Sequence, residues 1–256
     1  MEIDHIDAPS KPLSPKQREI RDRPGLILKV ARALIDNEGF TAVTIDRLAK
    51  EMSCSRPPIY EHFTSREDVV MGLAIEDTIQ RWKLLKRAAT FDGRAREKLV
   101  AMNEFTFRTY PEHLKILCIL QPNSVREKAT KSHRETLEDY EARAFDLLTR
   151  IVEEAIEDGD VVIPGCQSAA MISYPLLCLT FGGNTFESRN PYWPLQQRQF
   201  NRHLAARLGF LAVLDGFNWK PLSLEWDYID TIGRARKELD IDGYIEETTA
   251  EKASSQ

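Results

Sequence analysis

The sequence feature that most constrains this chain is a helical periodicity over residues 27–63 that is broken twice by short turns. Apolar residues recur there at spacings of three and four, as on the buried face of an amphipathic helix. Gly39 stands where the first helix should end, and Thr44 stands where a side chain can cap the second. Pro57 and Pro58 then open a third, very short helix, since proline is tolerated in a first helical turn. Three helices in about forty residues indicate a helix-turn-helix arrangement.

The rest of the chain also predicts helices. A long helix begins after Ser65, and further helical patterns run over residues 94–109, 111–120, 125–158, 167–186, 195–216 and 223–239. No strand alternation and no repeat is convincing, so the expected fold class is all-α. We expect four parts, which are a flexible arm over residues 1–24, a helix-turn-helix domain over 25–68, a larger helical domain over 69–240 and a polar tail over 241–256.

Four short motifs follow one another near the N-terminus, at residues 39–40, 44–49, 55–63 and 65–68. As an ordered set they resemble the TetR family (TetR/AcrR-like) of bacterial transcriptional regulators. The resemblance implies an N-terminal DNA-binding domain and a larger helical domain that binds a small-molecule ligand and dimerises. It also implies that double-stranded operator DNA and a small-molecule effector are partners, and that helices near 167–186 and 195–216 form a homodimer.

The same resemblance assigns the residues that contact DNA, which are Thr44, Ser55, Arg56, Pro57, Pro58, Tyr60, His62 and Arg66. Ser55 and Arg56 stand at the start of the recognition helix, where backbone N–H groups and a guanidinium can face phosphate or base. Two residues depart from the family pattern. Pro58 stands where the family often has a small hydroxyl residue, and Glu61 puts an acid on the recognition helix. Glu61 either accepts from cytosine N4 or faces solvent, and Arg56 either reads a base or is a solvated cap residue.

The charge of the chain is unevenly distributed. The whole chain has a formal net charge of −5 and a sequence pI of about 5.7, which argues against a protein that coats nucleic acid indiscriminately. Residues 11–66 nevertheless hold eleven Lys and Arg against seven Asp and Glu, a net charge of +4. Four of these bases lie at the N-terminal end, namely Lys16, Arg18, Arg21 and Arg23. They form either an arm that contacts phosphates or the minor groove, or simply a soluble tail. This balance predicts weak nonspecific binding and dependence on paired half-sites.

The larger domain contains a stretch, residues 161–186, without any Asp, Glu, Lys or Arg. Such a helix is covered on more than one side, by a second copy or by the rest of its own chain. A ligand pocket would lie among the helices from about residue 66 to 186. Its expected lining residues are aromatic or large apolar side chains, each also explained as ordinary core, namely Trp82, Phe105, Phe107, Tyr110, Leu117, Tyr140, Tyr174 and Phe181.

Enzyme and metal motifs are not found. The sequence has no nucleophile elbow, no zinc-protease motif and no phosphate-binding loop, and its five histidines show no metal-ligand spacing, so we expect no catalysis, no metal and no cofactor. Four widely spaced cysteines, no secretory signal and no apolar run long enough for a membrane span predict a reduced, cytoplasmic chain.

The expected function is that of a sequence-specific transcriptional regulator, a repressor that binds a palindromic operator as a dimer and is released by a ligand. The alternative, motivated by Pro58 and Glu61, is a dimeric helical ligand-binding or interaction protein without sequence-specific DNA binding. A third hypothesis is a helical ligand-binding protein or enzyme whose N-terminus matches by chance.

Overall fold

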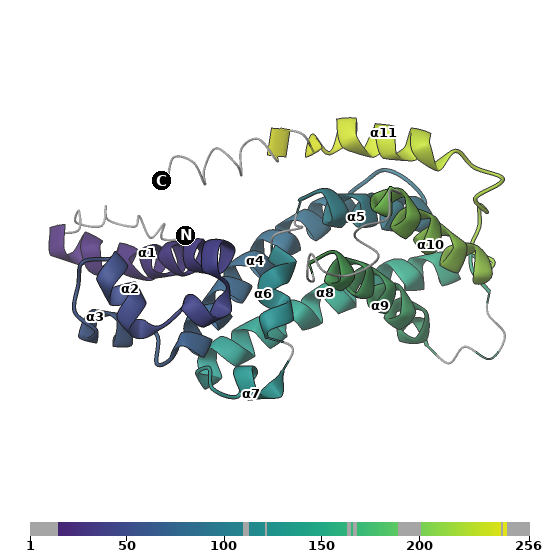
Figure 1. The fold of residues 1–256 in the computed structure, drawn as a ribbon. Coiled ribbons are helices and arrows are strands. Elements are labelled where there is room, and N and C mark those ends of the chain that lie inside the picture. The colour runs from purple at the N-terminus through teal and green to yellow at the C-terminus, as the bar shows by residue number, and fades with distance from the viewer. Residues whose placement is uncertain are drawn as a thin grey trace, which may run out of the picture.

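The computed structural model describes residues 15–109, 113–120, 122–162, 165, 168–188, 201–241 and 243–244. Every regular element in these residues is a helix, which confirms the all-α fold class (Figure 1). The helices follow in the order α1 (Pro15–Glu38), η1 (Phe40–Ala42), α2 (Ile45–Glu51), α3 (Pro57–Tyr60), α4 (Arg66–Ala89), α5 (Ala95–Thr109), α6 (His113–Ile119), α7 (Asn123–Arg126), α8 (Lys131–Glu157), α9 (Ala169–Ser188), α10 (Arg202–Gly216) and α11 (Tyr228–Glu238).

The helices α1, α2 and α3 lie together at one end of the molecule and form the expected helix-turn-helix (Figure 1). Gly39 follows α1 with a φ of +85°, in the left-handed region where a residue without Cβ is unstrained, and lets the chain turn away. Thr44 caps α2 as expected, because its side-chain oxygen accepts a hydrogen bond from the Arg47 backbone N–H at 3.1 Å. Ile27 and Ile59, both fully buried, join α1 and α3 in one apolar core.

The first helix is longer than the sequence pattern predicts. α1 begins at Pro15 and contains Pro24, so the expected flexible arm over residues 1–24 is wrong from Pro15 onward, and residues 1–14 lie outside the described part. A proline inside a helix removes one backbone hydrogen bond and crowds the preceding turn. It does not force the helix to end when the residues before it are mostly good helix formers such as Lys, Arg and Glu, as they are here.

The long helix α4 connects two apolar cores (Figure 1). Its first half, with Val69 and Leu73, belongs to the core that contains α1, α2 and α3 and that also includes residues of α6 and the start of α8. Its second half, with Leu84 and Ala88, belongs to the core of α5, α8, α9 and α10. A domain boundary at residue 68 would therefore fall within the first core.

One expected helix is divided in two. The pattern over residues 125–158 predicts a single helix, but α7 ends at Arg126 and α8 begins at Lys131. Thr130 caps α8, since its side-chain oxygen accepts from the His133 backbone N–H at 3.4 Å. The other expected helices lie close to the observed ones, although residues 195–200 of the pattern over 195–216 lie outside the described residues.

The second core contains a buried arginine. Arg96 of α5 is fully buried, and its guanidinium donates to Asp215 Oδ1 at 2.7 Å, to Ser223 Oγ at 2.9 Å and to the backbone carbonyl of Trp219. Trp219 is fully buried as well. The contact joins α5 to the end of α10, more than a hundred residues away along the chain.

The helices α9 and α10 contact each other and carry an exposed apolar face, formed by Met171, Tyr174, Leu177, Leu204 and Leu208. The opposite side of α9 is buried through Ile172 and Leu176. The uncharged stretch of α9, which ends before Glu187, is thus only partly covered within one chain. Within the described residues, no helix combines the length and the apolar character needed to cross a membrane.

Candidate nucleic-acid interface

The start of α2 offers a hydroxyl to a phosphate backbone. Thr44 is exposed, and its side-chain oxygen is already used as the acceptor that caps α2. The hydroxyl hydrogen remains available as a donor, because a threonine hydroxyl can accept and donate at the same time. Thr44 can therefore hold α2 in place and contact a phosphate with one group.

The start of α3 presents side chains rather than backbone donors. Ser55, Arg56 and Pro57 are exposed, and Pro58 is half-buried. Because proline has no N–H, Pro57 and Pro58 remove two of the backbone donors expected at this position. Arg56 is thus the strongest hydrogen-bond donor at the start of α3, and its Nε pairs with Asp46 Oδ1 of α2.

The end of α3 is held in place by buried apolar side chains. Ile59 is fully buried and Phe63 is nearly so, which turns Tyr60 toward solvent. His62 is half-buried, and its Nε2 atom is buried without a hydrogen-bond partner in the described residues. Tyr60 is therefore accessible to DNA, whereas the surroundings of His62 are closer to those of a packing residue.

Arg66, at the first position of α4, is held in two ways. Its guanidinium lies over the Phe40 ring, 4.8 Å from the centroid, and its Nε lies 3.2 Å from Glu67 Oε1. The side chain is still 38% exposed. Ser65 caps α4 as expected, accepting from the Asp68 backbone N–H at 3.0 Å. Arg66 is thus a preorganised cation beside α3.

Several acids of this region lie beside an arginine. Glu61, one of the two departures from the family pattern, is exposed and lies 3.8 Å from Arg23 of α1. Arg47 pairs with Glu38 at 3.0 Å and with Glu51 at 2.8 Å. The side chains of Lys16, Arg18 and Arg21, the other bases expected in an N-terminal arm, lie outside the described residues. Arg23 belongs to a helix and to an ion pair, so it is not part of a free tail.

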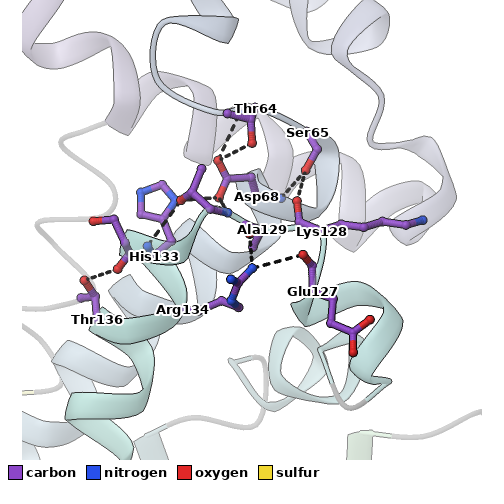
Figure 2. Close-up of polar contacts among 11 residues, drawn as sticks. Thr64, Ser65, Asp68, Glu127, Lys128, Ala129, His133, Arg134 and Thr136 are labelled. Atoms are coloured by element: carbon purple, nitrogen blue, oxygen red, sulfur yellow. Dashed lines mark hydrogen bonds and ion pairs between the residues drawn. The ribbon is translucent and has the colours of Figure 1, made fainter.

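A buried carboxylate at the start of α4 links this region to the larger helical part, as Figure 2 shows. Asp68 is fully buried. Its Oδ2 accepts from the backbone N–H and the hydroxyl of Thr64 at 2.9 and 3.3 Å. Its Oδ1 accepts from the backbone N–H and the hydroxyl of Thr130 at 2.9 and 3.1 Å, and lies 2.8 Å from His133 Nδ1. The N-termini of α4 and α8 therefore meet at one side chain.

The environment of Asp68 favours its charged form. Burial raises the pKa of this carboxyl, but the backbone N–H groups of Thr130 and Thr64 and the contact with His133 together hold it below its ordinary value of 3.8. Nearby, Ser65 Oγ donates to the Lys128 carbonyl at 3.0 Å, and Lys128 Nζ lies 3.6 Å from Glu67 (Figure 2 shows Ser65 and Lys128). No sequence spacing predicts this connection, because Thr130 and His133 are more than sixty residues from Asp68.

The larger helical part does not bring the expected ligand-lining residues into one described cavity. Phe105 is fully buried in the second core, whereas Leu117 belongs to the first core with α1, α2 and α3. Tyr174 is 64% exposed on the outer face of α9, so it does not line the interior. Phe181 is half-buried on the same helix. The side chain of Phe107 and all of Tyr110 lie outside the described residues.

Trp82, another expected lining residue, borders a described cavity. The cavity has a volume of about 400 Å³ between α4 and α8, and its other lining residues are Arg143, Asp146, Thr149, Arg150 and Glu153. Tyr140 is half-buried nearby on α8, with the Arg143 guanidinium 5.2 Å from its ring centroid. Four of these six lining residues are charged, so this cavity differs from the aromatic and apolar lining that the sequence predicts. In the part of the chain that the structure describes, no cluster of His, Cys, Asp and Glu could hold a metal ion.

The helix-turn-helix region matches a known family. The family model of bacterial regulatory proteins of the tetR family covers residues 27–71, from the buried Ile27 of α1 into the first turns of α4. Residues 27–71 are thus similar to this family. The TetR-like segment contains every residue that the sequence assigns to DNA contact, and it also contains Asp68.

Relatives and solved structures agree with this. The uncharacterized HTH-type transcriptional regulator Rv0681 of Mycobacterium tuberculosis is 30% identical over 87 residues, which are 34% of this chain and 39% of the relative. The HTH-type transcriptional regulator EthR of Mycolicibacterium smegmatis is 38% identical over 60 residues, which are 23% of this chain and 27% of the relative. The chain thus matches less than half the length of these curated relatives.

The likeness to solved structures extends over the larger helical part. The structure of the ketosteroid transcriptional regulator KstR2 of Mycobacterium tuberculosis has a TM-score of 0.55 and 18% sequence identity, and the match covers 76% of this chain and 94% of that one. At this identity the match concerns the fold alone. It shows that the similarity in fold extends over the helices that follow α4.

Proposed function

We propose that this protein is a sequence-specific DNA-binding transcriptional regulator, a repressor that binds a palindromic operator as a homodimer and is released by a small molecule. The observation that carries the proposal is the exposed Arg56 at the start of α3, which pairs with Asp46 of α2 within the segment that matches the tetR family. An exposed arginine on the second helix of a helix-turn-helix is well suited to read the major groove.

The contacts divide by chemistry. Thr44 and Arg66 suit phosphates, since one offers a hydroxyl donor and the other a held cation, and phosphate contacts fix register rather than sequence. Arg56 suits a base edge. Ser55 and Tyr60 are exposed beside it, whereas Pro57 and Pro58 can give only apolar contact, for instance with a thymine methyl group.

The apolar face of α9 and α10 supports a homodimer. Tyr174 of α9 and Leu208 of α10 are 64% and 50% exposed in the single chain. A second copy of the same face is the natural occupant, because two-fold dimers bring one patch against itself. Two recognition helices held about 34–36 Å apart by such a dimer would match successive major grooves of a palindrome.

Release by a ligand is supported by the path from α3 into the larger helical part. α4 begins directly after the α3 region and ends in the second core, and Asp68 ties its first turn to Thr130 and His133 of α8. A ligand that shifts α8 or the second half of α4 would therefore move α3. By linkage, operator DNA must then weaken ligand binding by the same factor as ligand weakens operator binding.

The test is selection of DNA from a random-sequence duplex library by the full-length protein, followed by titration of the recovered duplex. Arg56→Ala should weaken the recovered site by about 1–3 kcal/mol and weaken unrelated duplexes much less. Arg66→Ala should weaken all duplexes similarly and reduce the salt slope by about 1. Arg143→Ala, at an exposed arginine of α8, is the matched control and should change neither.

Recovery of no preferred duplex would contradict the proposal. It would favour the alternative of a dimeric helical protein that binds a ligand or a protein partner without sequence-specific DNA binding. Equal binding by the wild type, Arg56→Ala and Arg66→Ala would have the same consequence, because DNA would then be bound elsewhere.

A further inference from the structure

An ion pair crosses the turn between α2 and α3. Asp46, in the first turn of α2, places Oδ1 against the Nε of Arg56, which precedes the first residue of α3. The Arg56 and Asp46 side chains are 61% and 66% exposed. The pair therefore lies on the open surface that carries the proposed DNA contacts.

Stability alone does not account for this acid. Exposed ion pairs contribute about 0–1 kcal/mol to folding, and this helix-turn-helix is already held by buried apolar residues such as Leu48 and Ile59. A carboxylate on a DNA-facing surface also repels phosphates. Asp46 therefore has a cost for DNA binding that a neutral residue at the same position would avoid.

The chemistry of the guanidinium indicates what the pair can do. Arginine has five N–H donors in a rigid fork, and the Asp46 carboxylate forms an ion pair with this fork at Nε. The two terminal nitrogens, Nη1 and Nη2, make no ion pair within the described residues. These are the groups that donate to O6 and N7 of guanine in a bidentate contact. A carboxylate on Nε also restricts the rotamers of a long side chain, so less freedom is lost when DNA binds.

We propose that Asp46 is a positioning residue that sets sequence specificity, by orienting Arg56 toward a guanine in each operator half-site. The proposal rests on the proposed function and adds a residue to it. The neighbouring Arg47 offers a contrast, because Glu38 and Glu51 engage both its Nη2 and its Nε and leave it no comparable free edge.

The experiment compares base preferences at each position of the site. Full-length wild type and variants select duplexes from one random-sequence library, and sequencing gives a preference for every base. Wild type should prefer guanine at one position per half-site. Asp46→Asn should reduce that preference about fivefold or more, the lower end of what one bidentate arginine–guanine contact contributes, and leave other positions unchanged.

Glu51→Gln is the matched control. It removes one negative charge from the same helix and from a similar exposed ion pair, but it does not touch Arg56. Both variants should therefore raise affinity for nonspecific DNA by a similar factor, since each removes repulsion from phosphates. Only Asp46→Asn should change the guanine preference.

A double-mutant cycle with Arg56→Lys separates orientation from charge. Lysine keeps the positive charge but lacks the guanidinium, so it has no Nε for Asp46 to pair with. In the Arg56→Lys protein, Asp46→Asn should therefore cause no further loss of guanine preference. An equal loss in both backgrounds, or identical preferences for Asp46→Asn and Glu51→Gln, would overturn the assignment of Asp46. Absence of any preference in the wild type would instead overturn the proposed function and this inference with it.

Discussion

Replacing Asp68 by asparagine tests whether one buried carboxylate joins the helix-turn-helix region to the larger helical part. The substitution keeps the shape of the side chain, so it opens no cavity. It changes one acceptor oxygen into an NH₂ group and removes the charge. In the native protein the two oxygens face five donors, from Thr64, Thr130 and His133 (Figure 2).

The cost follows from these contacts. If the amide oxygen takes the place of Oδ1, the three donors from Thr130 and His133 keep an acceptor. The amide nitrogen then faces the Thr64 hydroxyl, which can rotate and accept, and the Thr64 backbone N–H, which cannot. One unsatisfied donor costs about 1–3 kcal/mol, and the remaining bonds lose the assistance of the charge. We expect Asp68→Asn to lower the free energy of unfolding by about 2–4 kcal/mol.

Urea denaturation monitored by circular dichroism measures this loss. The control is Asp230→Asn on α11, because Asp230 also lies in the first turn of a helix but is exposed. Asp230→Asn should lower the free energy of unfolding by less than about 1 kcal/mol, which is the contribution of a charge near a helix N-terminus or in an exposed ion pair. Equal effects of the two substitutions would refute the reasoning, since helix dipoles and surface pairs would then suffice to explain both.

The pH dependence gives an independent check. The folded-state pKa of Asp68 lies below that of an unfolded aspartate, so the carboxylate stabilises the fold above an unfolded pKa of about 3.9. This contribution is lost as the pH falls from there through the folded-state pKa. Asparagine does not titrate, so the difference between wild type and Asp68→Asn should shrink over that window, and a constant difference would contradict the assigned role.

Three further predictions concern packing and assembly. Gly72→Ala should destabilise the protein by about 1–3 kcal/mol in urea denaturation, because the new Cβ would lie 2.8 Å from a side-chain carbon. Gly233→Ala should instead stabilise it by about 0.5–1 kcal/mol, because the space around Gly233 is open. Leu208→Glu should give a folded monomer in sedimentation velocity, and a persistent dimer would exclude the α9–α10 face as the dimer interface. The control is Ile229→Glu on α11, which should leave the dimer intact because Ile229, although 65% exposed, is not part of that face. Arg96→Met should cost about 3–5 kcal/mol of unfolding free energy, since Asp215 loses its buried partner, and unchanged stability would mean that the pair is dispensable.

Local rules predicted much of the fold. The apolar spacing, Gly39, the caps Thr44 and Ser65, and the paired prolines 57 and 58 each act within a few residues, and the structure has helices and turns where they predict them. The same kind of rule was wrong at Pro24, where a helix continues, and incomplete at Thr130, where a cap divides an expected helix. In both places one residue favours a helix end or start, while the longer pattern around it favours a continuous helix. The length of the pattern alone does not decide which of the two prevails.

Long-range connections could not be predicted in this way. Asp68 meets Thr130, and Arg96 meets Asp215, only because distant helices pack side by side. No spacing rule links residues so far apart in sequence. In the sequence, Asp68 suits the positive end of the α4 dipole, which explains an acid there but not one that is fully buried. The ligand site is the feature least accessible to prediction from sequence, since its lining depends on how several helices pack together.

The charge of the DNA-binding region acquires a more specific meaning once its contacts are considered. The net charge of +4 over residues 11–66 treats all charges alike. In the structure Arg23, Arg47, Arg56 and Arg66 each lie beside a carboxylate, and Arg66 also lies over an aromatic ring. Carboxylates so placed weaken the attraction of these arginines for any phosphate and fix the directions in which their remaining donors point. Such a surface gives little affinity to a single nonspecific contact. It favours recognition that requires the correct base at Arg56 and the correct spacing between two copies.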